Sequence, residues 1–254
     1  MERLSASPRP PAASELVADQ LRMAIQLGHY LPGDRFPPER ELSEQLAVSR
    51  TTLREAGRIL EAEGLVKAKH GRAGGLVIQD RQLPTHEARR LLKERMAYIN
   101  TVFDYRLAVE AATAGLAATR RTSSDLRSLR RCLEEMDELV AGRDGGRAVI
   151  PRFKATDNRF HVGIAKAARN PLLEDSVLKA HAEIYHPINA VFDQLEPYMN
   201  EPHRAILEAI ERKDASAAER IMREHIEETR TAVSYHVRTG KVYQPRSPAR
   251  PGRS

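Results

Sequence analysis

The sequence predicts a mainly α-helical protein with a small N-terminal domain that ends in a β-hairpin and a larger all-helical C-terminal domain. The length of 254 residues is enough for two ordinary domains. Tryptophan is absent and aromatic residues make up 5% of the chain, which favours helices packed through Leu, Ile and Ala over a β-sandwich. From residue 80 almost to Gly240 the apolar residues recur with helical period.

Composition predicts a soluble cytoplasmic protein. The single cysteine, Cys132, excludes an intramolecular disulfide and suits a reducing compartment. No apolar run approaches the roughly 20 residues of a membrane span, and the N-terminus lacks a signal-peptide core. The net charge of +6 does not by itself indicate nucleic-acid binding, because residues 1–80 carry no net charge. Much of the excess lies in residues 240–254, a Pro/Arg-rich tail that we expect to be disordered.

The first helix is expected between Ser14 and Gly28, after a flexible Pro-rich arm at residues 1–13. Leu16, Val17 and Leu21 fall on one helical face, and Gly28 is expected to end the helix. The following YLPGDRFPP, with its three prolines, predicts a loop.

Two further helices and a hairpin complete this domain. Pro38 suits the first helical position of PERELSEQLA, a short helix ending near Ala47. Ser49 is a suitable N-cap for a helix that runs to about Glu63 and stops at Gly64. LVKAKH and GLVIQ are strand-like runs separated by GRAG, which predicts a hairpin.

This order of elements predicts a winged helix-turn-helix over residues 14–80. In such modules the second helix of the pair lies in the major groove of DNA. Its apolar positions, such as Leu53 and Leu60, are expected to face inward, which leaves Arg50, Arg54 and Arg58 facing outward. Arginine can donate two hydrogen bonds to guanine, and Ser49, Thr51 and Thr52 could contact phosphates or bases.

A solvated helix face is the alternative interpretation of these arginines. Arg58 could pair with Glu55 or Glu61, and Arg54 with Glu61 or Glu63. Periodicity alone does not separate the two interpretations. The position of the helix after a proline loop and before a hairpin favours DNA binding.

The stretch PGDRFPPERELSEQLAVSRTTLREAGRILEAEGLVKAKHGRAGG closely resembles the DNA-binding domain of the GntR superfamily of bacterial transcription regulators. The resemblance covers about residues 14–79. It implies double-stranded operator DNA as a partner, with contacts from Arg40, Ser49, Arg50, Thr51, Thr52, Arg54, His70 and Gly71. The chain departs from the family at Gly57, where a leucine is usual. A glycine inside a helix costs about 1 kcal/mol relative to alanine.

Six or seven helices with short connections predict an all-α domain over residues 87–239, after a boundary near residues 80–86. Four polar residues on three of these helices share faces with apolar residues. Asp157 and His161 are four residues apart, and His203 and His225 occupy corresponding inward positions on later helices. A divalent metal would satisfy a buried carboxylate and three imidazoles together. The alternative is separate core histidines, with Asp157 paired to Arg159 or Lys154.

Residues 87–236 resemble the helical FCD effector domain of the FadR subfamily, and the Asp-x3-His, His, His pattern is similar to that of its metal-containing branch. The resemblance implies a metal, zinc first and nickel or another transition metal otherwise, below a pocket for small organic acids. Arg106 matches an arginine near that pocket and could clamp the carboxylate of the effector, or it could pair with Glu110. His181 and His186 are further candidates for the pocket wall.

We therefore expect a homodimeric, metabolite-responsive transcription regulator. We expect it to repress transcription until a ligand binds. Two alternatives remain at this point. The metal could activate water in an enzyme of small organic acids, although the sequence offers no separate general base. It could also be purely structural.

Overall fold

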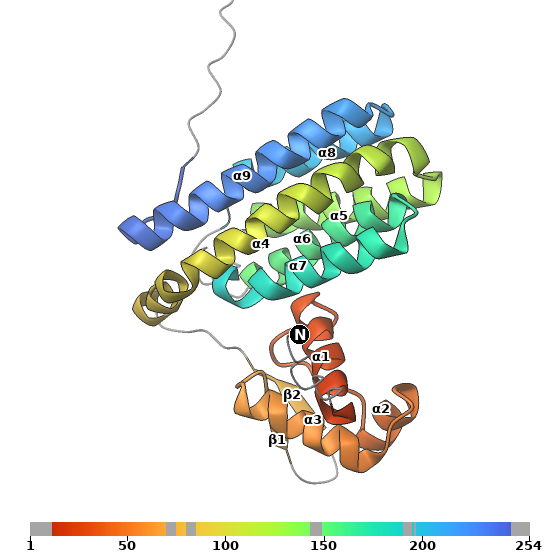
Figure 1. Ribbon diagram of the computed structural model, residues 1–254, viewed down its shortest axis with the longest axis vertical. Coiled ribbons are helices and arrows are strands. Elements are labelled where there is room, and N and C mark those ends of the chain that lie inside the picture. The colour runs from red at the N-terminus through yellow and green to blue at the C-terminus, as the bar shows by residue number, and fades with distance from the viewer. Residues whose placement is uncertain are drawn as a thin grey trace, which may run out of the picture. The chain divides into compact units, whose positions relative to one another are not determined.

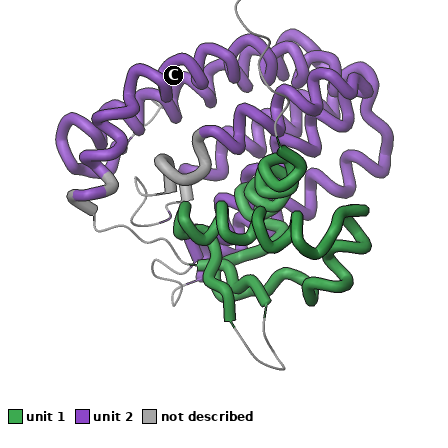
Figure 2. The backbone as a smooth tube through the Cα atoms, turned by 60° about the horizontal axis from the view of Figure 1, so that its bottom comes forward, with its two compact units in different colours: residues 1–81 green, residues 82–254 purple. Residues whose placement is uncertain are grey.

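The structure is a computed structural model that describes residues 12–69, 75–79, 85–142, 149–189, 195 and 197–244. The chain divides into two units, residues 1–81 and 82–254, which Figure 2 colours separately. The two predicted DNA-contact residues His70 and Gly71 lie outside the described residues, as do most of the N-terminal arm, the linker and most of the tail. No described helix combines the length and the apolar character that crossing a membrane requires.

The described residues of unit 1 form three helices and a two-stranded antiparallel sheet, as predicted. They are α1 (Ala13–Gln26), α2 (Glu39–Gln45), α3 (Arg50–Ala62), β1 (Val66–Lys69) and β2 (Gly75–Ile78). Gly28, at φ 72°, follows α1, and Gly64, at φ 71°, follows α3, which is the left-handed conformation that glycine adopts without strain.

Three details of unit 1 differ from the sequence-based expectation. Leu16 was expected on the buried face of α1 but is 51% exposed, because the buried face is centred on Ala18. Pro38 is the N-cap of α2 rather than its first residue, and α2 ends at Gln45. The proline loop also contributes to the sheet, since Phe36 N donates to Leu76 O at 3.0 Å and Arg35 forms a bridge with Val77.

Gly57 lies where α3 meets β2. A Cβ added at Gly57 would come within 3.2 Å of Leu76 Cδ1, which is closer than ordinary van der Waals contact. The buried face of α3 consists of Leu53, Ala56, Gly57 and Leu60. The glycine therefore permits a close approach of the wing strand to this helix.

Unit 2 is all-helical in its described residues (Figure 1). The α-helices are α4 (Thr85–Arg120), α5 (Ser123–Ala141), α6 (Ile150–Ala167), α7 (Pro171–Asn189), α8 (Glu201–Glu211) and α9 (Ala215–Thr239), and Pro197–Asn200 form a 3-10 helix. The six α-helices of the described residues agree with the expected six or seven.

The long helices α4 and α9 pack side by side and carry much of the core (Figure 1). Phe103 on α4 and Met222, Ile226 and Val233 on α9 are fully buried. Arg89, near the start of α4, donates from Nε to Val237 O and from Nη2 to Arg238 O, both at 2.8 Å. These bonds satisfy carbonyl groups that the end of α9 leaves without helical partners.

Candidate metal centre and DNA-contact surface

Helix α3 begins at a side-chain cap. Ser49 Oγ accepts a hydrogen bond from Thr52 N at 3.0 Å and lies 2.8 Å from Thr52 Oγ1. The cap fixes the first turn of α3, where Arg50 and Thr51 are exposed. The predicted N-cap is thus confirmed, and Ser49 and Thr52 have local partners that position the N-terminus of the helix.

Arg50 and Arg54 share one carboxylate, that of Glu39 at the start of α2. Arg50 Nε lies 2.7 Å from Glu39 Oε1, and Arg54 Nε lies 2.9 Å from Glu39 Oε2. The hydrogen bond from Arg54 and the one from Arg50 outweigh the effect of burial and lower the pKa of Glu39. Both arginine side chains remain about 60% exposed. The terminal guanidinium nitrogens are not used in these two bonds.

The pairing of Arg54 differs from the one that the solvated-face interpretation expected. Glu63 instead forms a bidentate contact with Arg22 of α1, at 2.9 and 2.6 Å, and Glu61 accepts a hydrogen bond from Ala68 N of β1. Arg40 is 80% exposed and lies 3.6 Å from Glu44. Glu39 was not singled out in the sequence, because nothing in its spacing marks it as a partner of α3.

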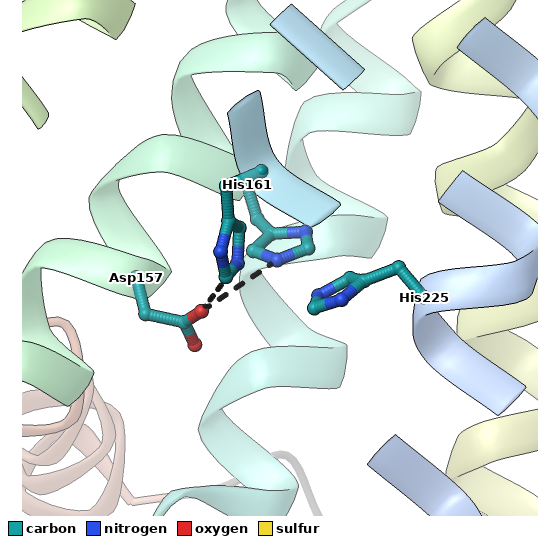
Figure 3. A group of neighbouring side chains, drawn as sticks. Asp157, His161 and His225 are labelled. Carbon is teal, nitrogen blue, oxygen red and sulfur yellow. Dashed lines mark ion pairs between the residues drawn. The ribbon is translucent and has the colours of Figure 1, made fainter. Parts of the chain in front are cut away.

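The four predicted metal ligands converge inside unit 2 (Figure 3). Asp157 and His161 come from α6, His203 from α8 and His225 from α9, and one ligand atom from each lies within 4.8 Å of the others. Asp157 Oδ1 is 2.9 Å from His203 Nε2 and 3.9 Å from His161 Nε2. The His161 and His225 rings are stacked with centroids 5.3 Å apart. A single ion could draw these groups together at bonds of about 2.0–2.2 Å.

Two of these histidines have ring nitrogens without a hydrogen bond of normal geometry. The ring nitrogens of His161 and His203 are buried and form no hydrogen bond of normal geometry, although one nitrogen of each lies within 3 Å of a carboxylate oxygen. Buried polar atoms in this state are costly unless they bind something. The donor set, one carboxylate and three imidazoles, is one that zinc and related ions accept, so the residues fit a metal.

Protonation in the cluster also suits a metal. Burial lowers the pKa of His161 from 6.5 to about 4. Burial also lowers the pKa of His225 well below its usual value, and the neighbouring His203 and His161 add to this shift. Burial opposes ionisation of Asp157, but Lys154 and His203 outweigh it and hold the pKa of this carboxyl well below its usual value. His161 and His225 thus favour the neutral imidazole and Asp157 the carboxylate, the forms that bind metal.

The alternative partners of Asp157 are only partly present. Lys154 Nζ lies 3.9 Å from Asp157 Oδ2, whereas Arg159 instead contacts Glu135 at 2.7 Å. The separate-core interpretation gives each histidine its own partner, and His161 does have Glu110 at 2.6 Å, but His161 and His203 also adjoin each other with centroids 5.6 Å apart.

Glu110 on α4 is a site residue that the sequence marked only as a partner of Arg106. Its Oε1 accepts a hydrogen bond from Arg106 Nε, and its Oε2 lies 2.6 Å from His161 Nδ1 and 3.2 Å from His181 Nε2. Arg106 and Glu110 are 4% and 2% exposed. Burial opposes ionisation of Glu110, but Arg106, His181 and His161 together hold its pKa well below the usual value. The i,i+4 pair considered as the alternative for Arg106 is therefore formed.

A winged helix with exposed arginines, joined to a helical domain with a buried cluster of Asp and His, is an architecture typical of DNA-binding transcription regulators. Family models agree: "Bacterial regulatory proteins, gntR family" matches residues 13–75 and "FCD domain" matches residues 101–228. The chain belongs to the GntR family of transcription regulators, in the group with an FCD domain. It is a regulator and not an enzyme.

Relatives span most of the chain. The Uxu operon transcriptional regulator of Escherichia coli (strain K12) is 30% identical over 221 residues, which cover 83% of this chain and 82% of that protein. The Exu regulon transcriptional regulator of the same organism is 30% identical over 228 residues, 85% of this chain and 82% of that protein. The solved structure of E. coli McbR/YncC shares the fold, with a TM-score of 0.54 at 18% identity, over 89% of this chain and 99% of that one.

Proposed function

We propose that this regulator is a homodimeric repressor that binds palindromic operator DNA and releases it when a small carboxylate binds at a metal in unit 2. The observation that carries the proposal is the convergence of Asp157, His161, His203 and His225 in a chain whose other unit exposes Arg50 and Arg54. A metal with three imidazoles and one carboxylate keeps positions open for a ligand oxygen.

In the proposed site this chain would supply three imidazole nitrogens and one carboxylate oxygen to the metal. His161, His203 and His225 would bind the metal through ring nitrogens, and Asp157 through Oδ1. The metal, when bound, acts as a Lewis acid that attracts a carboxylate oxygen. A direct clamp by Arg106 on the effector stays a prediction, since its Nε is engaged by Glu110 and its Nη2 lies 3.3 Å from His181 Nε2.

On DNA, each protomer would insert α3 into the major groove, with the free terminal nitrogens of Arg50 and Arg54 directed at base edges. Arg40, Ser49, Thr51 and Thr52 would fix the helix on the phosphates, and His70 and Gly71 would contact DNA from the wing. Two such modules related by a two-fold axis match two half-sites. The effector would act by binding the two states of the dimer unequally, typically by about 1–3 kcal/mol.

Metal content is the first test. Protein purified without a metal-affinity tag should contain about one metal ion per chain, zinc before nickel, by elemental analysis. A matched His161→Gln, His225→Gln variant should contain none and keep its helical circular dichroism. The metal site is ruled out if the wild-type protein is folded without metal and neither zinc nor chelators change its stability.

Coupling to DNA is the second test. An operator fragment is selected from random DNA with the zinc-loaded protein, and its affinity is followed by fluorescence anisotropy during titration with small 2-hydroxy and dicarboxylic acids. An active acid should weaken binding at least fivefold, and the histidine variant should not respond. If every acid leaves the affinity unchanged while zinc stabilises the protein, the metal is structural. One relative, 26% identical, is the Glc operon transcriptional activator of E. coli. If an acid tightens DNA binding instead of weakening it, the proposed direction of the response is overturned.

A further inference from the structure

We propose that Glu110 is a positioning residue of the metal centre: it fixes the His161 ring with Nδ1–H toward its carboxylate, so that Nε2 is the atom available to the metal. Arg106 and His181 hold Glu110 in place for this role. The inference rests on the proposed metal site and assigns it a second layer of residues on α4 and α7.

The short distance between His161 and Glu110 determines the tautomer. His161 Nδ1 and Glu110 Oε2 are 2.6 Å apart, and both atoms are buried. If Nδ1 carried no proton, its lone pair would face a carboxylate lone pair at this distance, which is repulsive. A proton on Nδ1 turns the contact into a charge-assisted attraction. A neutral imidazole with its proton on Nδ1 has its lone pair on Nε2.

The free nitrogen of His161 then faces the other ligands. Nε2 is the atom that lies 3.9 Å from Asp157 Oδ1, and the rings of His203 and His225 have their centroids 5.6 and 5.3 Å from that of His161. Metal-bound histidines usually donate their second N–H to a carboxylate or carbonyl, which fixes the ring and makes it a better donor to the metal. In the proposed site Glu110, 2.6 Å from Nδ1, would supply that carboxylate for His161.

Glu110 is itself held by groups from two helices. Arg106, one turn earlier on α4, binds Oε1, and His181 of α7 adjoins Oε2 at 3.2 Å. The other ring nitrogen of His181 lies 2.8 Å from Asn158 Oδ1, and Asn158 directly follows the ligand Asp157. Helices α4, α6 and α7 therefore meet at one carboxylate, whose orientation cannot change without disturbing all three.

A second metal bound by Glu110, His161 and His181 is the competing interpretation, since these three groups also lie close enough to hold an ion. Two observations oppose it. The guanidinium of Arg106 is in direct contact with Glu110 and would repel a second cation. Both Glu110 oxygens already have partners, and His161 would have to give a different nitrogen to each ion.

Zinc affinity is one test, measured on the full-length protein by competition with a chromophoric chelator. Glu110→Gln removes the charge but keeps the size of the side chain, and should weaken zinc binding about 10- to 100-fold with one zinc per chain retained. Glu183→Gln is the matched control, since Glu183 is an exposed carboxylate that accepts a hydrogen bond from Tyr98. The control should bind zinc as wild type does.

Histidine tautomers are the second test, and the first readout is taken on the wild-type protein. Two-bond 15N–1H spectra of 15N-histidine-labelled wild type, assigned with His161→Gln, should show His161 protonated at Nδ1 and, with zinc, metal bound at Nε2. In Glu110→Gln the metal-free ring should shift toward Nε2–H, which a merely structural loss would not cause.

The outcomes separate the two proposals. Wild type that binds no zinc overturns the metal site and this inference together. Wild type that binds zinc while Glu110→Gln binds it equally well overturns only the role of Glu110. Two zinc ions per chain, or metal at Nδ1 of His161, would identify Glu110 as a ligand and also overturn the inference.

Discussion

Arg50 is the side chain at which DNA contact can be tested most directly. It lies in the first turn of α3, is 60% exposed, and keeps its terminal nitrogens clear of Glu39. Arg50→Ala should cost about 1–3 kcal/mol of operator binding and relax specificity at one base pair, because a bidentate arginine reads one guanine. The measurement is anisotropy on operator variants at fixed salt.

Arg58→Ala is the control for this experiment. Arg58 is exposed on the same helix, two turns after Arg50. Its removal should weaken all DNA sequences alike or change nothing. If Arg50→Ala leaves both affinity and base preference intact, α3 is not the reading helix.

Glu39 adds a second prediction at the same scale. Its carboxylate orients Arg50 and Arg54 and, in the proposed complex, would place a negative charge near the DNA. Glu39→Gln should therefore lower the ratio of specific to non-specific binding, with non-specific affinity equal or higher because a repulsive charge is lost. Competition between operator and random DNA measures the ratio. Glu41→Gln is the matched control, since Glu41 is an exposed carboxylate of α2 that accepts a hydrogen bond from Gln45. An unchanged ratio in Glu39→Gln would contradict a positioning role.

At the scale of elements, the contact between α3 and β2 explains the unusual Gly57. The added Cβ would press on Leu76, so a larger residue must displace the wing strand or the helix. Gly57→Leu, which restores the residue usual in the family, should destabilise unit 1 by about 1–3 kcal/mol through overpacking.

Adding Leu76→Ala to Gly57→Leu should recover much of that loss, because the exchange roughly conserves volume across the contact. Thermal unfolding of the two single variants and the double variant gives the coupling energy. Additive effects would show that Gly57 does not act through Leu76.

At the scale of the whole molecule, the buried cluster predicts acid sensitivity in the absence of metal. Folding lowers the pKa of His161 from 6.5 to about 4 and lowers that of His225. Between these values the unfolded chain binds more protons than the folded one, so stability is complete above about pH 6.5 and falls as the pH drops toward 4. Each histidine contributes a slope of about 1.4 kcal/mol per pH unit within its window. The lowered pKa values of Glu110 and Asp157 extend the loss below about pH 4.5.

Calorimetry of metal-free protein between pH 7.5 and 4.5 measures this effect on the unfolding of unit 2. His161→Gln should flatten the dependence, whereas His29→Gln, at an exposed position in unit 1, should not. If the unfolding temperature of unit 2 stays constant over this range, His161 and His225 are not held buried and neutral in the folded protein.

Local physics explains what the sequence by itself determined. Helical period, the Ser49 cap and glycines such as Gly28 depend on near neighbours in the chain, and these predictions are confirmed. The inward direction of Asp157, His161, His203 and His225 also follows from period, because each shares a face with apolar residues.

Tertiary structure alone decided which carboxylates serve which sites. Glu39 and Arg54 are 15 residues apart, and Glu110 and His181 are 71 apart. No local period relates such pairs, since only the packing of α2 on α3 and of α4 on α6 and α7 brings them together. The sequence therefore predicted which arginines are candidates for DNA contact and which four residues are candidate metal ligands. The fold determined the two buried or half-buried glutamates that hold them, because a charge partner is chosen by distance in space.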